Sequence, residues 1–196
     1  MPLILASSSP RRRDLLAASA IPFRIIPAAV DEQPFPHERA EVYVRRLALA
    51  KAEAVAQHHP DAIVLGADTI VTIDDLLLGK PHTPQVARQM LHRLRGREHE
   101  VMTGVAVVAG RVAERSGDRY AQAVVASRIR MHQFTAATIE WYLATGEPLD
   151  KAGAYAVQGL GAALVERVEG SYTNAVGLPV TEMLALLGQF GITGPR

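Results

Sequence analysis

The feature that most limits the fold is an apolar run from Ala62 to Ile73, Ala-Ile-Val-Leu-Gly-Ala-Asp-Thr-Ile-Val-Thr-Ile. Its many β-branched residues, and the turn residues Asp74 and Asp75 that follow it, are typical of a strand in the middle of a sheet. The run contains one charged residue, Asp68. Burying this carboxylate is costly unless it meets a cation, a metal ion or several hydrogen-bond donors, or is protonated.

Two interpretations of Asp68 are open at this point. A structural carboxylate could be paired with an arginine. A functional carboxylate is the interpretation we favour, because an ionisable group in such a run often belongs to a site. Gly66, two residues earlier, also indicates a bulge or a close backbone approach, which often re-aims a side chain beside a site.

The N-terminal segment predicts a strand at 3–5, a loop at Ser7 to Ser9 and a helix from Pro10, with Ser9 as its N-cap. Free N–H groups at a helix N-terminus, serine hydroxyls and the forks of Arg11 and Arg12 all suit a phosphate. The spacing is not that of a Walker A loop. A capped surface helix with solvated arginines is the equal alternative.

Two further residues are candidates for a site. Glu32 lies beside Asp31 in a proline-containing loop, where carboxylates are commonly solvated. Lys51 lies in the apolar stripe of a helix predicted from about 37 to 58, with Leu47 one turn before it. Its ammonium must therefore reach past the helix edge to water or find a partner in a cavity.

The rest of the chain predicts further strands and helices separated by turn residues. A loop rich in glycine, 147–161, has the composition of a segment whose backbone approaches a ligand. The other expected elements are strands at 23–26, 76–78, 101–107, 120–131 and 162–168, a more polar stretch at 112–119, and helices that begin near Thr83, Thr135 and Pro179.

Composition excludes several kinds of chemistry. The 196 residues carry a formal net charge of +1, which argues against a dedicated nucleic-acid surface. There is no cysteine, and the seven histidines lack zinc-site spacing. The first apolar run is too short for a signal peptide or a membrane span, so we expect a cytoplasmic protein with no membrane partner.

These patterns predict one α/β domain over 1–196, with a mixed central β-sheet flanked by helices and two lobes around a cleft. Cations beside carboxylates indicate a polyphosphate with a metal ion. Carboxylate oxygens without histidine or cysteine suit Mg²⁺ or Mn²⁺, which would neutralise phosphate charge and help to activate a water.

Short segments along nearly the whole chain match one family in order. The segments are Ala6-Ser-Ser-Ser-Pro-Arg-Arg12, Val30-Asp-Glu32, Leu49-Ala-Lys51, Gly66-Ala-Asp-Thr-Ile-Val71, Gly79-Lys-Pro81, His99-Glu-Val-Met-Thr-Gly104, Glu147-Pro-Leu-Asp-Lys-Ala-Gly-Ala-Tyr155, Gln158-Gly159 and Gly177-Leu-Pro179. On these segments the chain resembles the Maf-family nucleotide pyrophosphatases, also known as septum formation inhibitors, and the resemblance implies an ITPase-like fold.

The resemblance implies cleavage of a nucleoside triphosphate between its α and β phosphates, with a divalent metal. Asp68 would be the catalytic residue, as base toward the attacking water or as metal ligand, and Glu32 would be the second ligand. The other implied site residues hold phosphates or complete the polar site; they are Ser7, Ser9, Arg11, Lys51 and Lys80. A homodimer is consistent with the resemblance.

The positions that separate the branches of the family correspond to Arg12, Thr69 and Gln158. Thr69 and Gln158 resemble the dTTP/UTP branch rather than the 7-methyl-GTP branch, and a hydroxyl and an amide suit the imide edge of a pyrimidine. Two alternatives stay open. One is a house-cleaning enzyme for modified pyrimidine nucleotides, and the other is a nucleotide-binding regulator of cell division that acts through a protein partner.

Overall fold

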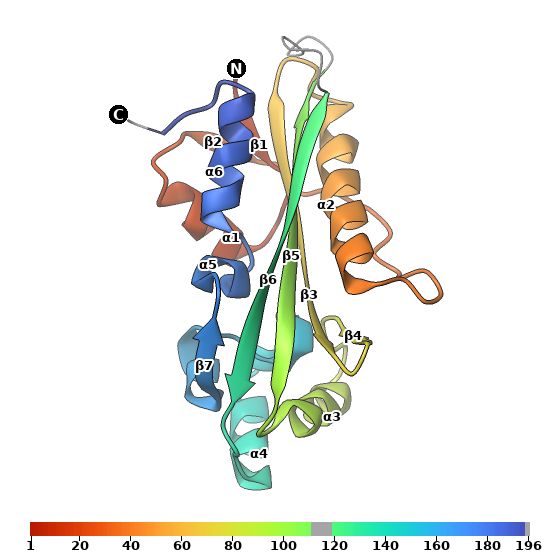
Figure 1. The fold of residues 1–196 in the computed structure, drawn as a ribbon, viewed down its shortest axis with the longest axis vertical. Helices are drawn as coiled ribbons and strands as arrows, with labels where there is room; N and C mark the ends of the chain where they lie inside the picture. The colour runs from red at the N-terminus through yellow and green to blue at the C-terminus, as the bar shows by residue number, and fades with distance from the viewer. Residues whose placement is uncertain (111–118, 195–196) are drawn as a thin grey trace. The chain divides into compact units, whose positions relative to one another are not determined.

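The computed structural model describes residues 1–110 and 119–194. Most of the polar stretch predicted at 112–119 therefore lies outside the described residues. A seven-stranded sheet has the order β2-β1-β3-β5-β6-β7, with β4 paired to β3 (Figure 1). The strands are β1 (Leu3–Leu5), β2 (Phe23–Ile25), β3 (Ile63–Ile73), β4 (Leu76–Leu78), β5 (Glu98–Ala109), β6 (Tyr120–Met131) and β7 (Val165–Glu169).

The sheet is mixed, as predicted. β1 runs parallel to β2 and β3, whereas β4 is antiparallel to β3 and β7 is antiparallel to β6. The helices are α1 (Pro10–Ala17), α2 (Ala40–Ala56), α3 (Pro84–Leu94), α4 (Ala136–Ala144), α5 (Tyr172–Val176) and α6 (Val180–Gln189). Among the described residues, no helix combines the length and apolar character needed to cross a membrane.

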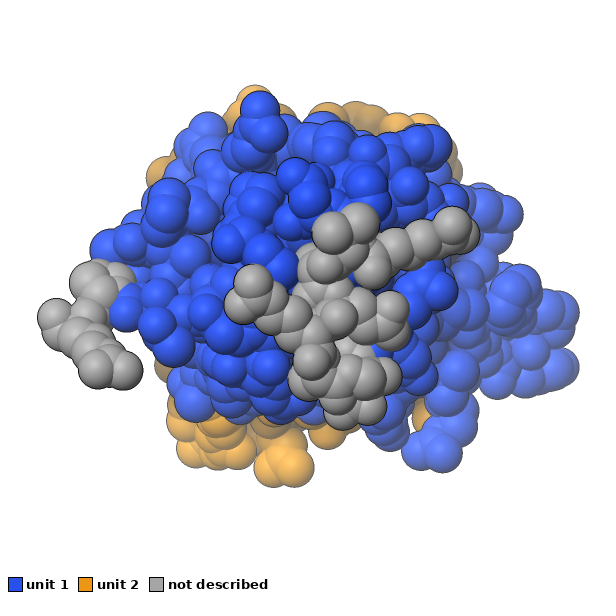
Figure 2. All heavy atoms as spheres, turned by 90° about the horizontal axis from the view of Figure 1, so that it is seen from above, with its two compact units in different colours: residues 1–68, 103–125, 177–196 blue, residues 69–102, 126–176 orange. Residues whose placement is uncertain are grey.

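The chain divides into two compact units, coloured separately in Figure 2. The first unit holds residues 1–68, 103–125 and 177–196, and the second holds 69–102 and 126–176. The mixed α/β fold is confirmed. The single domain, and the cleft between its lobes, stay predictions.

In the first unit, helices cover both faces of the sheet. α1 and α6 lie on one face and α2 lies on the other (Figure 1). Successive side chains of a strand point to opposite faces, so Ile63 and Leu65 pack with α1 and α6, whereas Val64 packs with α2. The same alternation directs Asp68 toward α2.

Two glycines allow α2 to approach the sheet closely. A Cβ on Gly66 of β3 would lie 2.3 Å from the carbonyl oxygen of Ala48, and one on Gly104 of β5 would lie 2.2 Å from that of Val44. Any larger residue would push the helix away from both strands. The glycine that the sequence marks as a close approach is therefore what sets α2 against β3.

In the second unit, threonine caps begin two helices. Thr83 accepts a hydrogen bond from the N–H of Val86 at the start of α3, and Thr135 accepts one from that of Thr138 at the start of α4. Between α4 and β7 the chain forms three short 3-10 turns, Glu147–Asp150, Ala152–Ala154 and Gly159–Leu164.

The structure corrects some boundaries. The strand predicted at 162–168 begins at Val165, because residues up to Leu164 belong to the last 3-10 turn. The helix predicted from about 37 begins at Ala40, after a loop that includes His37 with φ at 59°. The short helix α5 was not predicted.

Candidate active site

The centre of the candidate site is an ammonium group shared by two carboxylates. Lys51 Nζ lies 2.6 Å from Asp68 Oδ1 and 2.7 Å from Glu32 Oε1. The side chains of Lys51 and Asp68 are each 9% exposed, whereas that of Glu32 is 50% exposed. The cation that Asp68 needs is therefore a lysine, not an arginine, and Lys51 is buried rather than extended past the helix edge.

Each member of this ionic cluster comes from a different element. Asp68 lies on β3 and faces α2, where Lys51 lies on the inward stripe between the buried residues Leu47 and Val55. Glu32 lies in the loop before α2, and the Tyr43 hydroxyl donates a hydrogen bond of 2.9 Å to its backbone carbonyl. Removing one partner of a buried ion pair is costly because an uncompensated charge remains, so burial holds Lys51 and Asp68 together, and the half-exposed Glu32 shares the same ammonium.

Tyr43 is a residue of this site that the sequence argument missed. Burial, together with the carboxylates of Asp68 and Glu32, raises the pKa of the Tyr43 hydroxyl well above its ordinary value, so Tyr43 stays neutral and can donate. The available signal was its place beside Val44 on the core-facing side of the predicted helix, since a buried tyrosine hydroxyl usually finds a partner.

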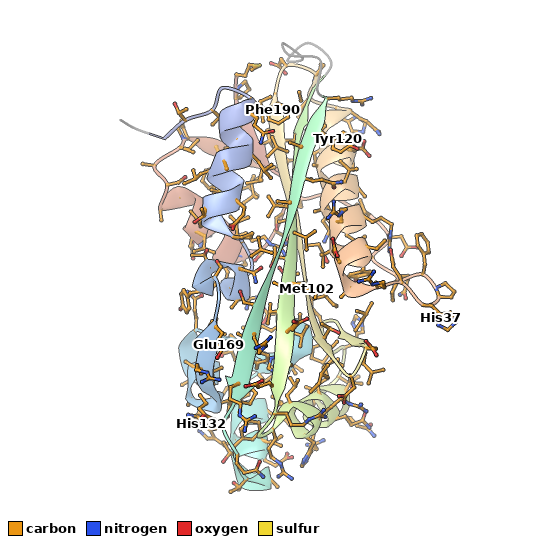
Figure 3. All side chains as sticks on the ribbon, viewed as in Figure 1. His37, Met102, Tyr120, His132, Glu169 and Phe190 are labelled. Carbon is orange, nitrogen blue, oxygen red and sulfur yellow. The ribbon has the colours of Figure 1, made fainter. Side chains whose placement is uncertain are left out.

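The loop that carries Glu32 is tied to α2 at a second point. Glu38 accepts two hydrogen bonds of 2.7 Å from Arg46, and the Arg46 guanidinium lies 4.2 Å from the centre of the Phe35 ring. The hydrogen bonds from Arg46 lower the pKa of Glu38. His37, labelled in Figure 3, lies at the outer end of this loop. Its neighbour Arg45 pairs with Glu41 on the exposed side of α2, so of these two arginines it is Arg46 that holds the loop.

The serine and arginine segment folds as predicted at the N-terminus of α1. The Ser9 hydroxyl accepts the N–H of Arg12 at 3.5 Å, and the buried Ser7 hydroxyl accepts the N–H of Ser9 at 3.2 Å. Arg12 also donates from Nη1 to Ser7 Oγ at 3.4 Å and from Nε to the carbonyl of Gly177 at 2.8 Å. Ser7, Ser9 and Arg12 therefore form one connected cradle.

The cradle lies within electrostatic reach of the ionic cluster. Burial lowers the pKa of the Arg12 guanidinium, and the carboxylates of Asp68 and Glu32 oppose that shift. The first unit thus brings together six of the predicted site residues: Ser7, Ser9, Arg12, Glu32, Lys51 and Asp68. It combines phosphate-type donors with a buried carboxylate.

The remaining predicted site residues are Arg11, Thr69, Lys80 and Gln158. Arg11 is partly buried on α1 and, among the residues that the structure describes, makes no ion pair. Thr69, Lys80 and Gln158 belong to the second unit. Thr69 is partly buried, whereas Lys80 and Gln158 are exposed. The roles of these four residues stay predictions.

Comparison with known proteins agrees with the sequence motifs. A family model described as "Maf-like protein" matches residues 2–190. A protein of Myxococcus xanthus named "dTTP/UTP pyrophosphatase" is 50% identical over 98% of this chain and 94% of its own length. Proteins of the same name from Moorella thermoacetica and Dictyoglomus thermophilum are 50% and 44% identical, over 97% and 96% of this chain and 95% and 96% of their own lengths.

A solved structure titled "The structure of the Staphylococcus aureus Ham1 protein" covers 68% of this chain and 73% of its own, at a TM-score of 0.42 and 10% identity. So slight a likeness supports no conclusion, and the ITPase-like fold stays a prediction. The family model and the relatives each match nearly the whole chain, and these matches are sufficient to assign the family. This chain belongs to the Maf-like protein family.

Proposed function

We propose that this protein hydrolyses dTTP and UTP between the α and β phosphates, releasing the nucleoside monophosphate and pyrophosphate. The observation that carries the proposal is the buried Asp68 carboxylate, held by Lys51 beside Glu32 and within electrostatic reach of the Ser7–Arg12 cradle. The names of the relatives, all dTTP/UTP pyrophosphatases, support the same reaction and substrates.

The reaction needs a water molecule to attack phosphorus. In our assignment Asp68 accepts the proton of that water as general base, or would hold the divalent metal ion that activates the water. A new bond forms between the water oxygen and the α phosphorus, and the bond from the α phosphorus to the oxygen that bridges it to the β phosphate breaks. Pyrophosphate leaves with the electron pair of that bond.

The cationic and hydroxyl groups bind the charge of the substrate. Phosphate oxygens accept hydrogen bonds from the N-terminus of α1, from Ser7 and Ser9, and from Arg11 and Lys80. The Lys51 ammonium compensates Asp68 and Glu32 until the substrate brings its own charges. Arg12, Thr69 and Gln158 select the nucleotide, with the hydroxyl and the amide facing the imide edge of the base.

The donor set suits a divalent metal. Asp68 and Glu32 place carboxylate oxygens around one ammonium, and Mg²⁺ is commonly bound by one or two carboxylates together with substrate phosphates. Within residues 1–110 and 119–194, no group of three or more histidines, aspartates or glutamates could hold a metal alone. Asp68 and Glu32 would therefore hold Mg²⁺ or Mn²⁺ together with phosphate and water. When bound, the ion neutralises phosphate charge and activates water.

A competition assay tests the substrate assignment. dTTP, UTP, a 5-modified uridine triphosphate, CTP, ATP and GTP are mixed at equal concentration with Mg²⁺, and each monophosphate is quantified. We expect dTMP and UMP first, with the modified uridine as a further product if the enzyme is house-cleaning. A strong preference for a purine would contradict the assigned roles of Thr69 and Gln158.

The same assay separates the enzyme from a regulator. A regulatory protein that only binds nucleotide would bind dTTP and release no pyrophosphate. We also place the protein in the cytoplasm, with the nucleoside triphosphates proposed as its substrates, and we keep a homodimer as a prediction that light scattering can check.

A further inference from the structure

The second unit contains a carboxylate that the proposed chemistry does not use. Glu147 Oε1 accepts hydrogen bonds from the Tyr142 hydroxyl at 2.8 Å and from the N–H of Gly161 at 2.9 Å. Its other oxygen, Oε2, accepts the N–H of Leu160 at 3.1 Å. One side chain thus holds two successive amides of the last 3-10 turn and is itself held by α4.

The local sequence explains how Glu147 reaches the amides of the last 3-10 turn. α4 ends at Ala144, and Gly146 has φ at 73°, so the chain reverses immediately before Glu147. Lys151 donates to the backbone carbonyl of Glu147 at 2.8 Å. Burial raises the pKa of the Glu147 carboxyl, but the hydrogen bonds from Gly161, Tyr142 and Leu160 outweigh it, and the pKa lies below its ordinary value.

The amides that Glu147 holds belong to the turn that follows Gln158. Gly159 has φ at 67°, and a Cβ there would lie 2.8 Å from Glu147 Oε2. A Cβ on Gly161 would lie 2.5 Å from the Tyr142 hydroxyl oxygen. The turn is therefore packed directly on the Tyr142–Glu147 pair. Gln158, at its start, remains exposed.

We propose that Glu147, supported by Tyr142, is a positioning residue for nucleotide selection: it fixes the 159–161 backbone so that the Gln158 amide is presented to the base in one orientation. This inference rests on the proposed function, in which Gln158 reads the pyrimidine. Glu147 itself touches neither the base nor the reacting phosphates.

Substitution by glutamine tests the role of the carboxylate. Glu147→Gln keeps the size of the side chain, but its amide nitrogen cannot accept a hydrogen bond. Three donors converge on the two oxygens, so at least one of them loses its acceptor. Tyr142→Phe is the milder variant, since it removes one donor and leaves both backbone contacts. Glu140→Gln is the matched control, because this exposed carboxylate of α4 pairs with Arg88.

The first readout is selectivity. We expect Glu147→Gln to raise KM for dTTP about 10-fold, the scale of one lost hydrogen bond, with kcat nearly unchanged and with weaker discrimination against GTP. In a Gln158→Ala background the same substitution should change discrimination little further, because the two residues act through one another. Independent, multiplying effects of Glu147→Gln and Gln158→Ala would overturn the proposal.

The second readout needs no turnover. Amide hydrogen exchange at Leu160 and Gly161, measured without nucleotide, should accelerate in Glu147→Gln and less in Tyr142→Phe, with no change in Glu140→Gln. Unchanged exchange in Glu147→Gln would overturn the proposal. Binding of the α,β-imido analogues of dTTP and GTP then separates two failures. A wild-type protein that does not discriminate between them contradicts the proposed function, whereas discrimination retained in Glu147→Gln contradicts only the positioning role.

Discussion

Two carboxylates, one in each unit, are held in opposite ways. Asp68 in the first unit meets a cation, Lys51 Nζ at 2.6 Å, and shares that cation with the half-exposed Glu32. Glu147 in the second unit meets neutral donors, two backbone amides and a tyrosine hydroxyl. The first arrangement concentrates charge at a point that solvent reaches through Glu32. The second uses charge to fix a backbone.

The two kinds of partner suit the two carboxylates to different roles. A carboxylate held by a lysine ammonium can exchange that partner for a metal ion or a proton. A carboxylate held by peptide N–H groups fixes the conformation of the backbone, because those donors cannot leave without unfolding the turn. We therefore assign the reaction to the ionic cluster of the first unit and the positioning of a specificity residue to the second.

The largest effect is expected from removing the shared cation. Lys51→Met leaves Asp68 buried without its partner, and breaking a buried pair in this way costs about 3–5 kcal/mol of unfolding free energy. Urea denaturation followed by circular dichroism measures it. The double variant Lys51→Met/Asp68→Asn should recover part of the loss, since no buried charge is then uncompensated. A Lys51→Met protein as stable as wild type would show that the cluster is not held by charge.

A pH titration of stability should show that the second unit keeps His99 in its neutral form. His99, 4% exposed and hydrogen-bonded to the Tyr155 hydroxyl at 2.6 Å, has its pKa lowered by burial from 6.5 to about 4. Between about pH 6.5 and pH 4, His99 is therefore protonated in the unfolded chain and neutral in the folded protein. The contribution of His99 to the free energy of unfolding is fully present above about pH 6.5, and it falls by about 3 kcal/mol as the pH drops to 4.

The variant His99→Gln isolates that contribution. We expect the difference between the unfolding free energies of wild type and His99→Gln to shrink as the pH is lowered from 7 to 4, because only the wild type carries the proton linkage. A difference that stays constant over this range would mean that His99 has the same pKa in the folded and the unfolded protein.

A smaller effect is expected at the neutral network. Tyr142→Phe removes one of three hydrogen bonds to Glu147 and should cost about 1–2 kcal/mol. Thermal unfolding measures the loss. Pyrophosphate release at saturating dTTP should stay near the wild-type rate. A large loss of kcat in this variant would place the second unit in the chemistry and would remove the distinction between the two carboxylates.

The smallest effect compares two helix caps. Ser9→Ala in the first unit and Thr83→Ala in the second each remove an N-cap, at about 1 kcal/mol. Only Ser9→Ala should also raise KM for dTTP, because Ser9 lies in the phosphate cradle. Equal kinetics for the two variants would show that Ser9 is a cap and nothing more.

Local pattern was enough to predict the scaffold of the site. The β-branched run with Gly66 and Asp68 predicted a central strand. The stripe through Leu47 and Lys51 predicted a helix whose lysine either reaches water or finds a partner in a cavity. The Ser9 cap was predicted from three adjacent residues. Each of these depends on contacts within one or two turns of chain, which periodicity and capping rules describe.

Long-range partners could not be predicted in the same way. The sequence shows that Asp68 and Lys51 each need a partner, but only the close approach at Gly66 makes them each other's partner. The strand predicted at 162–168 overlaps the end of the turn at Gly159–Leu164, and the Glu147 carboxylate that holds the start of this turn comes from a distant part of the sequence. The link from Tyr43 to the backbone of Glu32 has no signal beyond the need of a buried hydroxyl for an acceptor.

The most direct test is pyrophosphate release from saturating dTTP and Mg²⁺ by wild type and Asp68→Asn. Loss of a general base lowers kcat by about 10³-fold, and we predict that fall in an Asp68→Asn protein that is still folded by circular dichroism and retains dTTP binding, while Glu147→Gln keeps a kcat near that of wild type. An Asp68→Asn protein that releases pyrophosphate at the wild-type rate would contradict the assignment of the reaction to the ionic cluster.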